Sequence, residues 1–123
     1  MRSVVWILSI LFATSYCLAA DERARLVGST YLFDCGDSAY EITIESGTEL
    51  HWKLFKGDYP GPQEDQETYY KSKIADGIVL MSWIEASGLG VYNVLNFNNS
   101  TVTTHAREGD TTHINKGKVT RLP

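Results

Sequence analysis

The chain is short of cysteine and of basic residues, and each shortage excludes a class of protein. It has 123 residues with 2 cysteines, 11 lysines and arginines and 15 acidic residues, which gives a formal net charge of −4. Nucleic-acid binding rests mainly on neutralising phosphates, so an acidic chain without basic clusters is not expected to bind nucleic acid. Adhesion to anionic membranes is not expected for the same reason.

Several catalytic and cofactor motifs are missing as well. The sequence contains no glycine-rich phosphate loop, no nucleophile elbow and no paired-cysteine motif, so no cofactor is expected. His105 and His113 would face each other if residues 108–110 formed a three-residue hairpin loop. Zinc normally takes three or four protein ligands, and the sequence places no third, so no metal site is expected.

A long apolar run lies at the N-terminus. Arg2 precedes an apolar stretch over residues 4–13, small residues lead to Ala20, and charged residues begin at Asp21. This order is typical of a secretory signal peptide. The run is well short of the roughly 20 residues that span a bilayer. We therefore expect a signal peptide over residues 1–20, a mature domain over residues 21–123, a secreted or periplasmic location and no stable membrane insertion.

Cleavage would remove Cys17 and leave Cys35 as the single cysteine, so no internal disulfide is expected. The hydrophobic core alone must then hold the domain together. The thiol of Cys35 could be reactive, could form a dimer or could be buried, and burial is the commonest fate of a free cysteine. The sequence leaves the oligomeric state open.

Alternation of apolar and polar residues predicts β-strands throughout the mature chain. Tyr40, Ile42 and Ile44 alternate with polar residues, and Trp52 lies in a second run of this kind. Period-two alternation with β-branched and aromatic residues is typical of half-buried strands, and glycine-containing turns separate the runs. No stretch has a sustained helical period. The expected strands are residues 30–33, 40–45, 50–54, 67–74, 78–85, 89–97, 102–107 and 111–122, the last with a break at Gly117.

Eight short strands joined mostly by hairpins predict an all-β domain, with an eight-stranded up-and-down antiparallel barrel as the expected form. A barrel buries the apolar faces and removes exposed sheet edges. Its interior either fills with side chains or holds one small ligand. A sandwich of two sheets is the alternative, and strand counting barely separates the two. The loop over residues 57–65 would lie at the rim, where ligand contacts tend to occur.

One face of the expected strands combines aromatic residues with a few polar ones. Glu85 shares the parity of Trp83, and Asn93 shares that of Val91. A carboxylate among aromatic rings is costly to keep charged, so Glu85 should lie at the rim or have a raised pKa that suits proton transfer. A plain hydrophobic core and a solvated strand end are the alternatives. The candidate ligand-binding residues are Tyr31, Phe33, Trp52, Tyr70, Trp83, Glu85 and Asn93.

Two stretches of the chain resemble a known family. Residues 28–36 (GSTYLFDCG) and 76–85 (DGIVLMSWIE) are similar to the opening and central signatures of the phenolic acid decarboxylases and MoaF-like proteins. The order and spacing of the blocks agree across most of the mature chain. Residues 111–122 are more similar to small exported MoaF-like proteins than to the decarboxylases. The resemblance implies a lipocalin-like (calycin) barrel, which agrees with the strand count.

In the decarboxylases, a pair of tyrosines, an arginine and a glutamate surround the substrate. The resemblance places Tyr31 at the first tyrosine and Glu85 at the glutamate, and these are the candidate catalytic residues. Phe33 takes the place of the second tyrosine, and residues 61–65, where the arginine belongs, contain none. A guanidinium forms strong charge-assisted hydrogen bonds with a carboxylate, so phenolic acid decarboxylation is not expected here.

Three hypotheses about function remain. The first is a barrel that binds a small, largely apolar or aromatic ligand in its interior, with aromatic side chains stacking on the ligand and Glu85 and Asn93 orienting it. The second is a lyase- or decarboxylase-like enzyme that uses Glu85 as general acid or base and Tyr31 as hydrogen-bond donor. The third is a filled barrel that acts through its surface as a secreted interaction protein.

Overall fold

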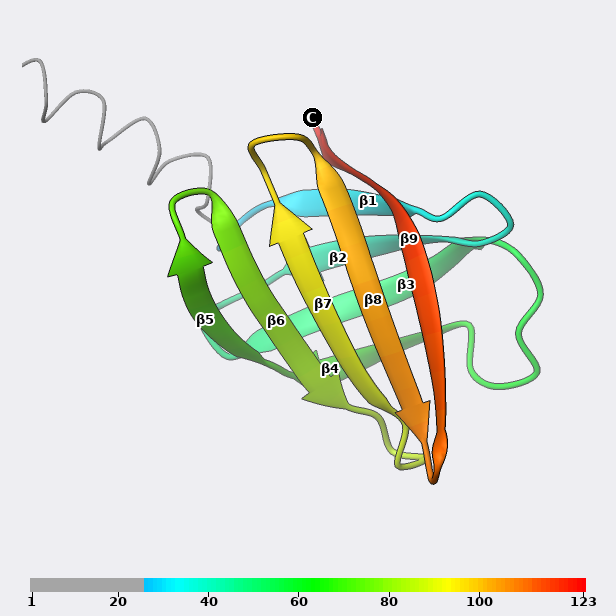
Figure 1. Ribbon diagram of the computed structural model, residues 1–123. Coiled ribbons are helices and arrows are strands. Elements are labelled where there is room, and N and C mark those ends of the chain that lie inside the picture. The colour runs from blue at the N-terminus through cyan, green and yellow to red at the C-terminus, as the bar shows by residue number, and fades with distance from the viewer. Residues whose placement is uncertain (1–25) are drawn as a thin grey trace, which may run out of the picture.

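The computed structural model describes residues 26–123, and the expected signal peptide over residues 1–20 lies outside the described residues. Within the described part, the chain forms nine strands and no helix (Figure 1). This part therefore contains no helix that could span a membrane. The strands are β1 (Thr30–Asp34), β2 (Ala39–Ile44), β3 (Glu49–Lys56), β4 (Glu64–Thr68), β5 (Tyr70–Ala75), β6 (Ile78–Ile84), β7 (Gly90–Asn96), β8 (Thr101–Glu108) and β9 (Thr111–Leu122).

All nine strands belong to one sheet that curls around a single interior. The order is β4-β3-β2-β1-β9-β8-β7-β6-β5, and every neighbouring pair is antiparallel. In Figure 1, β1 to β4 form the rear layer and β5 to β9 the front layer, with the strands of the two layers crossing. The all-β, lipocalin-like barrel expected from the sequence is confirmed in this curled form.

The structure has nine strands rather than eight because the predicted strand over residues 67–74 is two strands. The chain turns a corner at Tyr69, whose side chain is only 1% exposed. Its backbone N–H donates to the Thr48 carbonyl at 2.9 Å, and its hydroxyl donates to the Ser46 carbonyl at 2.7 Å. These bonds fix the corner, so β4 pairs with β3 and β5 pairs with β6 at the opposite edge of the sheet.

The two edges of the sheet approach each other without pairing. β5 pairs with β6 only as far as Tyr70 opposite Ser82, so the end of β6 extends beyond β5 and lies near β4. In residues 26–123 no backbone pairing joins β4 to β6.

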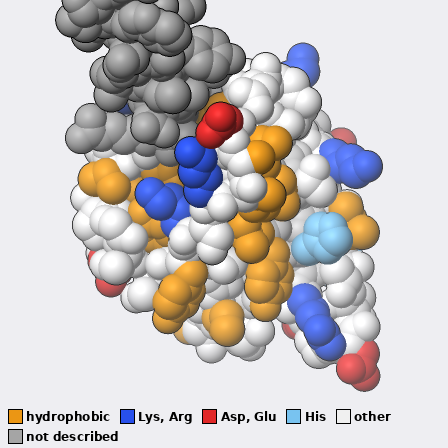
Figure 2. All heavy atoms as spheres, turned by 60° about the vertical axis from the view of Figure 1, so that its left-hand side comes forward, with side chains coloured by type: hydrophobic (Ala, Val, Ile, Leu, Met, Phe, Trp, Pro, Cys, Tyr) orange, Lys and Arg blue, Asp and Glu red, His pale blue; other side chains and the backbone are white. Residues whose placement is uncertain are grey.

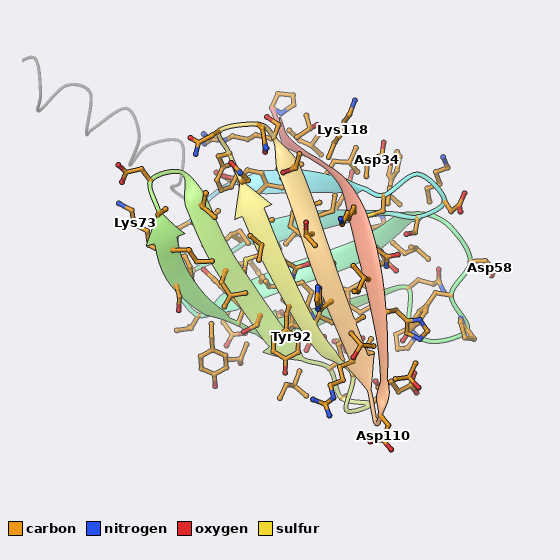
Figure 3. The ribbon with its side chains drawn as sticks, viewed as in Figure 1. Asp34, Asp58, Lys73, Tyr92, Asp110 and Lys118 are labelled. Atoms are coloured by element: carbon orange, nitrogen blue, oxygen red, sulfur yellow. The ribbon has the colours of Figure 1, made fainter. Side chains whose placement is uncertain are left out.

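The outer surface of β5 to β9 also carries apolar side chains. Figure 2 shows them with lysine or arginine side chains among them, and Figure 3 shows Tyr92 projecting from the outer face of β7. Single exposed apolar residues are normal on protein surfaces. The exposed large apolar residues on these strands are Tyr70, Ile74, Ile84, Tyr92, Val94 and Ile114.

The β8–β9 hairpin has a different register from the one considered in the sequence. Its turn has two residues rather than three, so Glu108 pairs with Thr111. His105 then pairs with Ile114, one position away from His113. Neighbouring positions on a strand point to opposite faces, so His105 and His113 do not face each other. Among residues 26–123, no group of three metal-ligating side chains gathers.

β9 continues through the break expected at Gly117. Its first part pairs with β8, and from Lys118 onward it pairs with β1, where Lys118 lies opposite Asp34. A Cβ atom at Gly117 would collide with the backbone of Asp34 and Cys35. Glycine therefore permits the close approach of β9 to the end of β1.

Candidate functional site

A cavity of about 100 Å³ lies at one end of the barrel interior. Most of its lining residues lie on strands β1 to β3 and β6 to β9, and the others come from the β1–β2 turn, the β3–β4 loop and the β6–β7 turn. The opposite end is filled by buried side chains such as Leu26 and Tyr69. The largest apolar lining residues are Phe33, Tyr40, Ile42, Trp52, Trp83, Leu89 and Val91, and the polar ones are Ser38, Glu85, Asn93, Thr104 and Asn115, with Cys35 and Tyr59 beside them.

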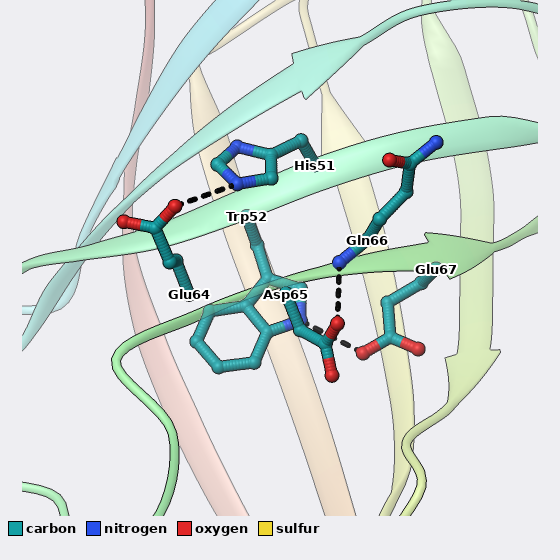
Figure 4. A network of polar contacts seen from close by, with 6 residues as sticks. All are labelled: His51, Trp52, Glu64, Asp65, Gln66 and Glu67. Carbon is teal, nitrogen blue, oxygen red and sulfur yellow. Dashed lines mark hydrogen bonds and ion pairs between the residues drawn. The ribbon is translucent and has the colours of Figure 1, made fainter.

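Two tryptophans in the cavity wall each donate the indole N–H to a carboxylate. Trp52 of β3 donates to Oε2 of Glu67 on β4 at 2.9 Å, the dashed contact beside the ring in Figure 4. Trp83 of β6 donates to Oε2 of Glu85 at 3.3 Å, two residues along the chain. Both indole N–H groups are therefore occupied by protein acceptors.

Strand β4 separates its acidic side chains between two faces. Asp65 and Glu67 share one face, and Asp65 lies opposite Trp52 in the strand register. Glu64 occupies the other face and pairs with the ring of His51 at 3.2 Å, as Figure 4 shows. Alternation along the strand thus places two of the three acids on the face that carries Trp52, where Glu67 is buried and Asp65 remains exposed.

Burial raises the pKa of both wall carboxyls. For Glu85, burial is the main cause, the hydrogen bond from Trp83 opposes it, and the negative charges of Glu67 and Asp65 add to it. For Glu67, burial again dominates, the bond from Trp52 opposes it, and Asp65 raises the pKa further. The described residues that line the cavity include no lysine, arginine or histidine that could offset these charges.

Asn93 supplies a fixed polar group inside the barrel. Its side chain is 1% exposed, its Nδ2 donates to the Met81 carbonyl at 3.1 Å, and its Oδ1 accepts the Thr104 hydroxyl at 2.7 Å. An amide has two donors and two lone pairs, so one of each remains for a ligand. The bonds to β6 and β8 hold the amide in one orientation.

Three residues at the mouth of the cavity are not among the ligand-binding residues predicted from the sequence. Tyr40 packs edge-on against Trp52 with ring centroids 6.2 Å apart, while Tyr59 comes from the β3–β4 loop and Cys35 from the turn after β1. Burial raises the pKa of all three, with Glu85 adding to the shift for both tyrosines and Asp34 for Cys35. They are therefore neutral groups at pH 7.

Comparison with known proteins agrees with this architecture. A sequence profile of the MoaF-like family matches residues 27–120, which include all but the end of β9. The chain belongs to the MoaF-like family. Among solved structures, a Burkholderia vietnamiensis protein provisionally assigned as a β-lactamase matches this MoaF-like chain with a TM-score of 0.70 and 19% identity, over 79% of this chain and 95% of that one. Identity this low establishes the shared fold alone. No curated protein matches.

Five of the seven candidate ligand-binding residues of this MoaF-like protein lie together at the cavity: Phe33, Trp52, Trp83, Glu85 and Asn93. The prediction that Tyr70 faces the interior is wrong, because its side chain is 71% exposed on β5. The corner at Tyr69 reverses the expected parity and buries Tyr69 instead.

Tyr31 lies in the core rather than in the cavity wall. It is 2% exposed and packs against Phe97 with ring centroids 5.6 Å apart. The structure therefore does not bring Tyr31 and Glu85 together at one cavity. In this MoaF-like chain, Glu85 is the only one of the two candidate catalytic residues that lines it.

Proposed function

We propose that this MoaF-like protein binds one small, largely apolar or aromatic molecule inside its barrel, and that it does so after export. The observation that carries the proposal is the cavity of about 100 Å³ with Trp52 and Trp83 in its wall. Small-molecule sites are typically concave and apolar with a few placed polar groups. Glu85 and Asn93 supply such groups here.

The size of the cavity limits the ligand. An apolar cavity of roughly 150 Å³ binds benzene, whereas sites for drug-sized ligands measure roughly 300–1,000 Å³. A cavity of about 100 Å³ is smaller than the one that binds benzene, so it suits one ring whose substituent extends through the mouth past Tyr59. The empty space also favours ligand binding over a fully packed barrel that acts only through its surface.

Binding is favoured over decarboxylase-like chemistry. Tyr31 is outside the cavity wall, and Phe33 lacks a hydroxyl. A phenolic acid would bring its carboxylate toward Glu85 without a guanidinium to receive it. Like charges in a low-dielectric site repel strongly, so the residues that remain do not support binding of such a substrate.

Tryptophan fluorescence tests the proposal. The chain has three tryptophans; Trp6 lies in the expected signal peptide, and the other two both line the cavity. The exported protein is titrated with benzyl alcohol, a neutral single-ring probe. A saturable change in emission with one-to-one stoichiometry is expected, and a wild-type protein that gives no saturable change would contradict the proposal.

Two substitutions on β7 localise the binding. Val91 lines the cavity, whereas Val94 is exposed on the outer face of the same strand. Val91→Phe should fill the cavity and abolish the response, and Val94→Phe should preserve it. The intact mass of the exported protein, expected to lack residues 1–20, tests the export part of the proposal separately.

A further inference from the structure

The charges around the cavity have one sign. Glu85 lines the cavity, Glu67 is bonded to the Trp52 ring of its wall, and the exposed Asp65 lies on the same face of β4 as Glu67. None of the described lining residues is cationic. His51 of β3 pairs with Glu64 on the other face, as Figure 4 shows. His113 of β9 lies opposite Ala106 in the strand register, but it is exposed and is not among the lining residues. The wall therefore presents carboxylates that no cationic side chain of the cavity neutralises.

The aromatic groups of the wall complement these charges. Both indole N–H donors are bonded to carboxylates, so neither is available to receive an anionic ligand. Trp52 and Trp83 both line the cavity, and the Tyr40 ring packs against Trp52 at 74°. A cation within about 6 Å of the face of an aromatic ring is attracted to the ring electrons, most strongly for tryptophan.

Resting on the proposed function, we infer that the cavity selects a small organic cation, namely a protonated amine or quaternary ammonium group carried on a ring or short apolar body. The apolar body lies against Trp52 and Trp83, and the ammonium group lies at the mouth beside Glu85. Both the carboxylates and the ring faces attract a positive charge there. A neutral ligand of the same shape lacks this attraction, and an anionic one is repelled.

Three ligands of nearly the same shape but different charge distinguish the effect of charge on affinity from the effect of shape. Benzylamine is cationic at pH 7, benzyl alcohol is neutral and benzoate is anionic. Calorimetric titration of the exported protein should show benzylamine binding about 10-fold more tightly than benzyl alcohol, with benzoate weakest. Equal affinity for benzylamine and benzyl alcohol, or tighter binding of benzoate, overturns the charge inference and leaves the proposed function standing. Binding of none of the three overturns the proposed function as well.

Glu85→Gln tests the residue that is expected to receive the ammonium group. Glutamine keeps an acceptor for the Trp83 indole N–H but removes the charge. Benzylamine affinity should fall about 10-fold, and the preference for benzylamine over benzyl alcohol should fall with it. Glu64→Gln is the matched control, because it removes the same charge from the outward face of β4.

The control also separates a site from a general effect of net charge. Glu64→Gln should leave benzylamine binding within about twofold of wild type, since exposed charges are screened. An equal loss in Glu64→Gln and Glu85→Gln overturns the inference. If Glu85→Gln does not fold, Glu67→Gln replaces it, because Glu67 is the buried carboxyl bonded to Trp52 of the cavity wall. A loss of benzylamine affinity is expected in this variant, and no change overturns the inference.

Discussion

Buried carboxylates in the barrel wall are expected to lower the free energy of unfolding, although they contribute polar groups to the proposed ligand site. Glu67 is 7% exposed, and its Oε2 accepts the Trp52 indole N–H. Burying a charged group is costly unless a cation or several hydrogen bonds compensate it. Because Asp65 adds a like charge nearby, the folded chain holds Glu67 in an environment that favours the protonated acid.

The pH dependence of folding tests this. The folded-state pKa of Glu67 is raised above its ordinary value of 4.5, so between these two values the folded chain binds more protons than the unfolded chain. The free energy of unfolding should therefore fall as pH rises through that window and stay lower above it. Glu67→Gln should be more stable than wild type at pH 7 and should lose less stability between pH 4 and 7.

Urea denaturation at a series of pH values measures the effect. Glu64→Gln, on the outward face of the same strand, should give no such gain in stability. A Glu67→Gln protein that is less stable than wild type at pH 7 would contradict the account, because it would mean that the charged carboxylate stabilises the wall.

The two wall carboxylates differ in how far the sequence predicts them. Glu85 follows Trp83 at the spacing of one strand face, so alternation alone brings it to the interior. Glu67 is the first residue of the predicted strand over residues 67–74, and its contact with Trp52 depends on the pairing of β4 with β3. That pairing joins residues more than ten positions apart, so no local sequence pattern predicts it.

Among the elements, β9 has the most demanding backbone position. Its first part extends the β8 hairpin and its second part pairs with β1. At Gly117 the strand passes so close to Asp34 and Cys35 that a Cβ atom would meet backbone rather than a flexible side chain. Backbone cannot move aside without disturbing the pairing of β1 with β9.

Gly117→Ala should therefore destabilise the protein by about 2–3 kcal/mol, the upper part of the range for overpacking substitutions. Gly47→Ala is the matched control, since a Cβ there meets nothing within 4 Å. Urea denaturation of both variants gives the difference in free energy of unfolding. Equal stability of the two would refute the close approach of β9 to β1.

Turn-forming glycines made most elements predictable. Gly77, Gly88 and Gly109 all have positive φ angles and lie at the three hairpin turns expected there. The strand over residues 67–74 was misread because Tyr69 and Tyr70 are adjacent aromatic residues, and alternation cannot decide which one faces inward. Tyr69 faces inward because it forms hydrogen bonds with the backbone of Ser46 and Thr48, which lie far away in the sequence.

At the scale of the whole molecule, the barrel type was predictable and the cavity was not. Period-two alternation and hairpin turns specify a meandering antiparallel sheet, and such a sheet must curl to bury one face. Whether the interior fills depends on how side chains such as Tyr31 and Trp83 pack, which strand counting does not reveal. The structure places Tyr31 in the filled end and Trp83 at the empty one.

A crystal structure of this protein soaked with benzyl alcohol tests the central claim most directly. We predict density for one aromatic ring in the cavity, in contact with Trp52 and Trp83, with the hydroxyl group directed toward Glu85 or Asn93. A ring bound only to the outer apolar surface around Tyr92 and Val94, with the cavity closed by its own side chains, would contradict the account.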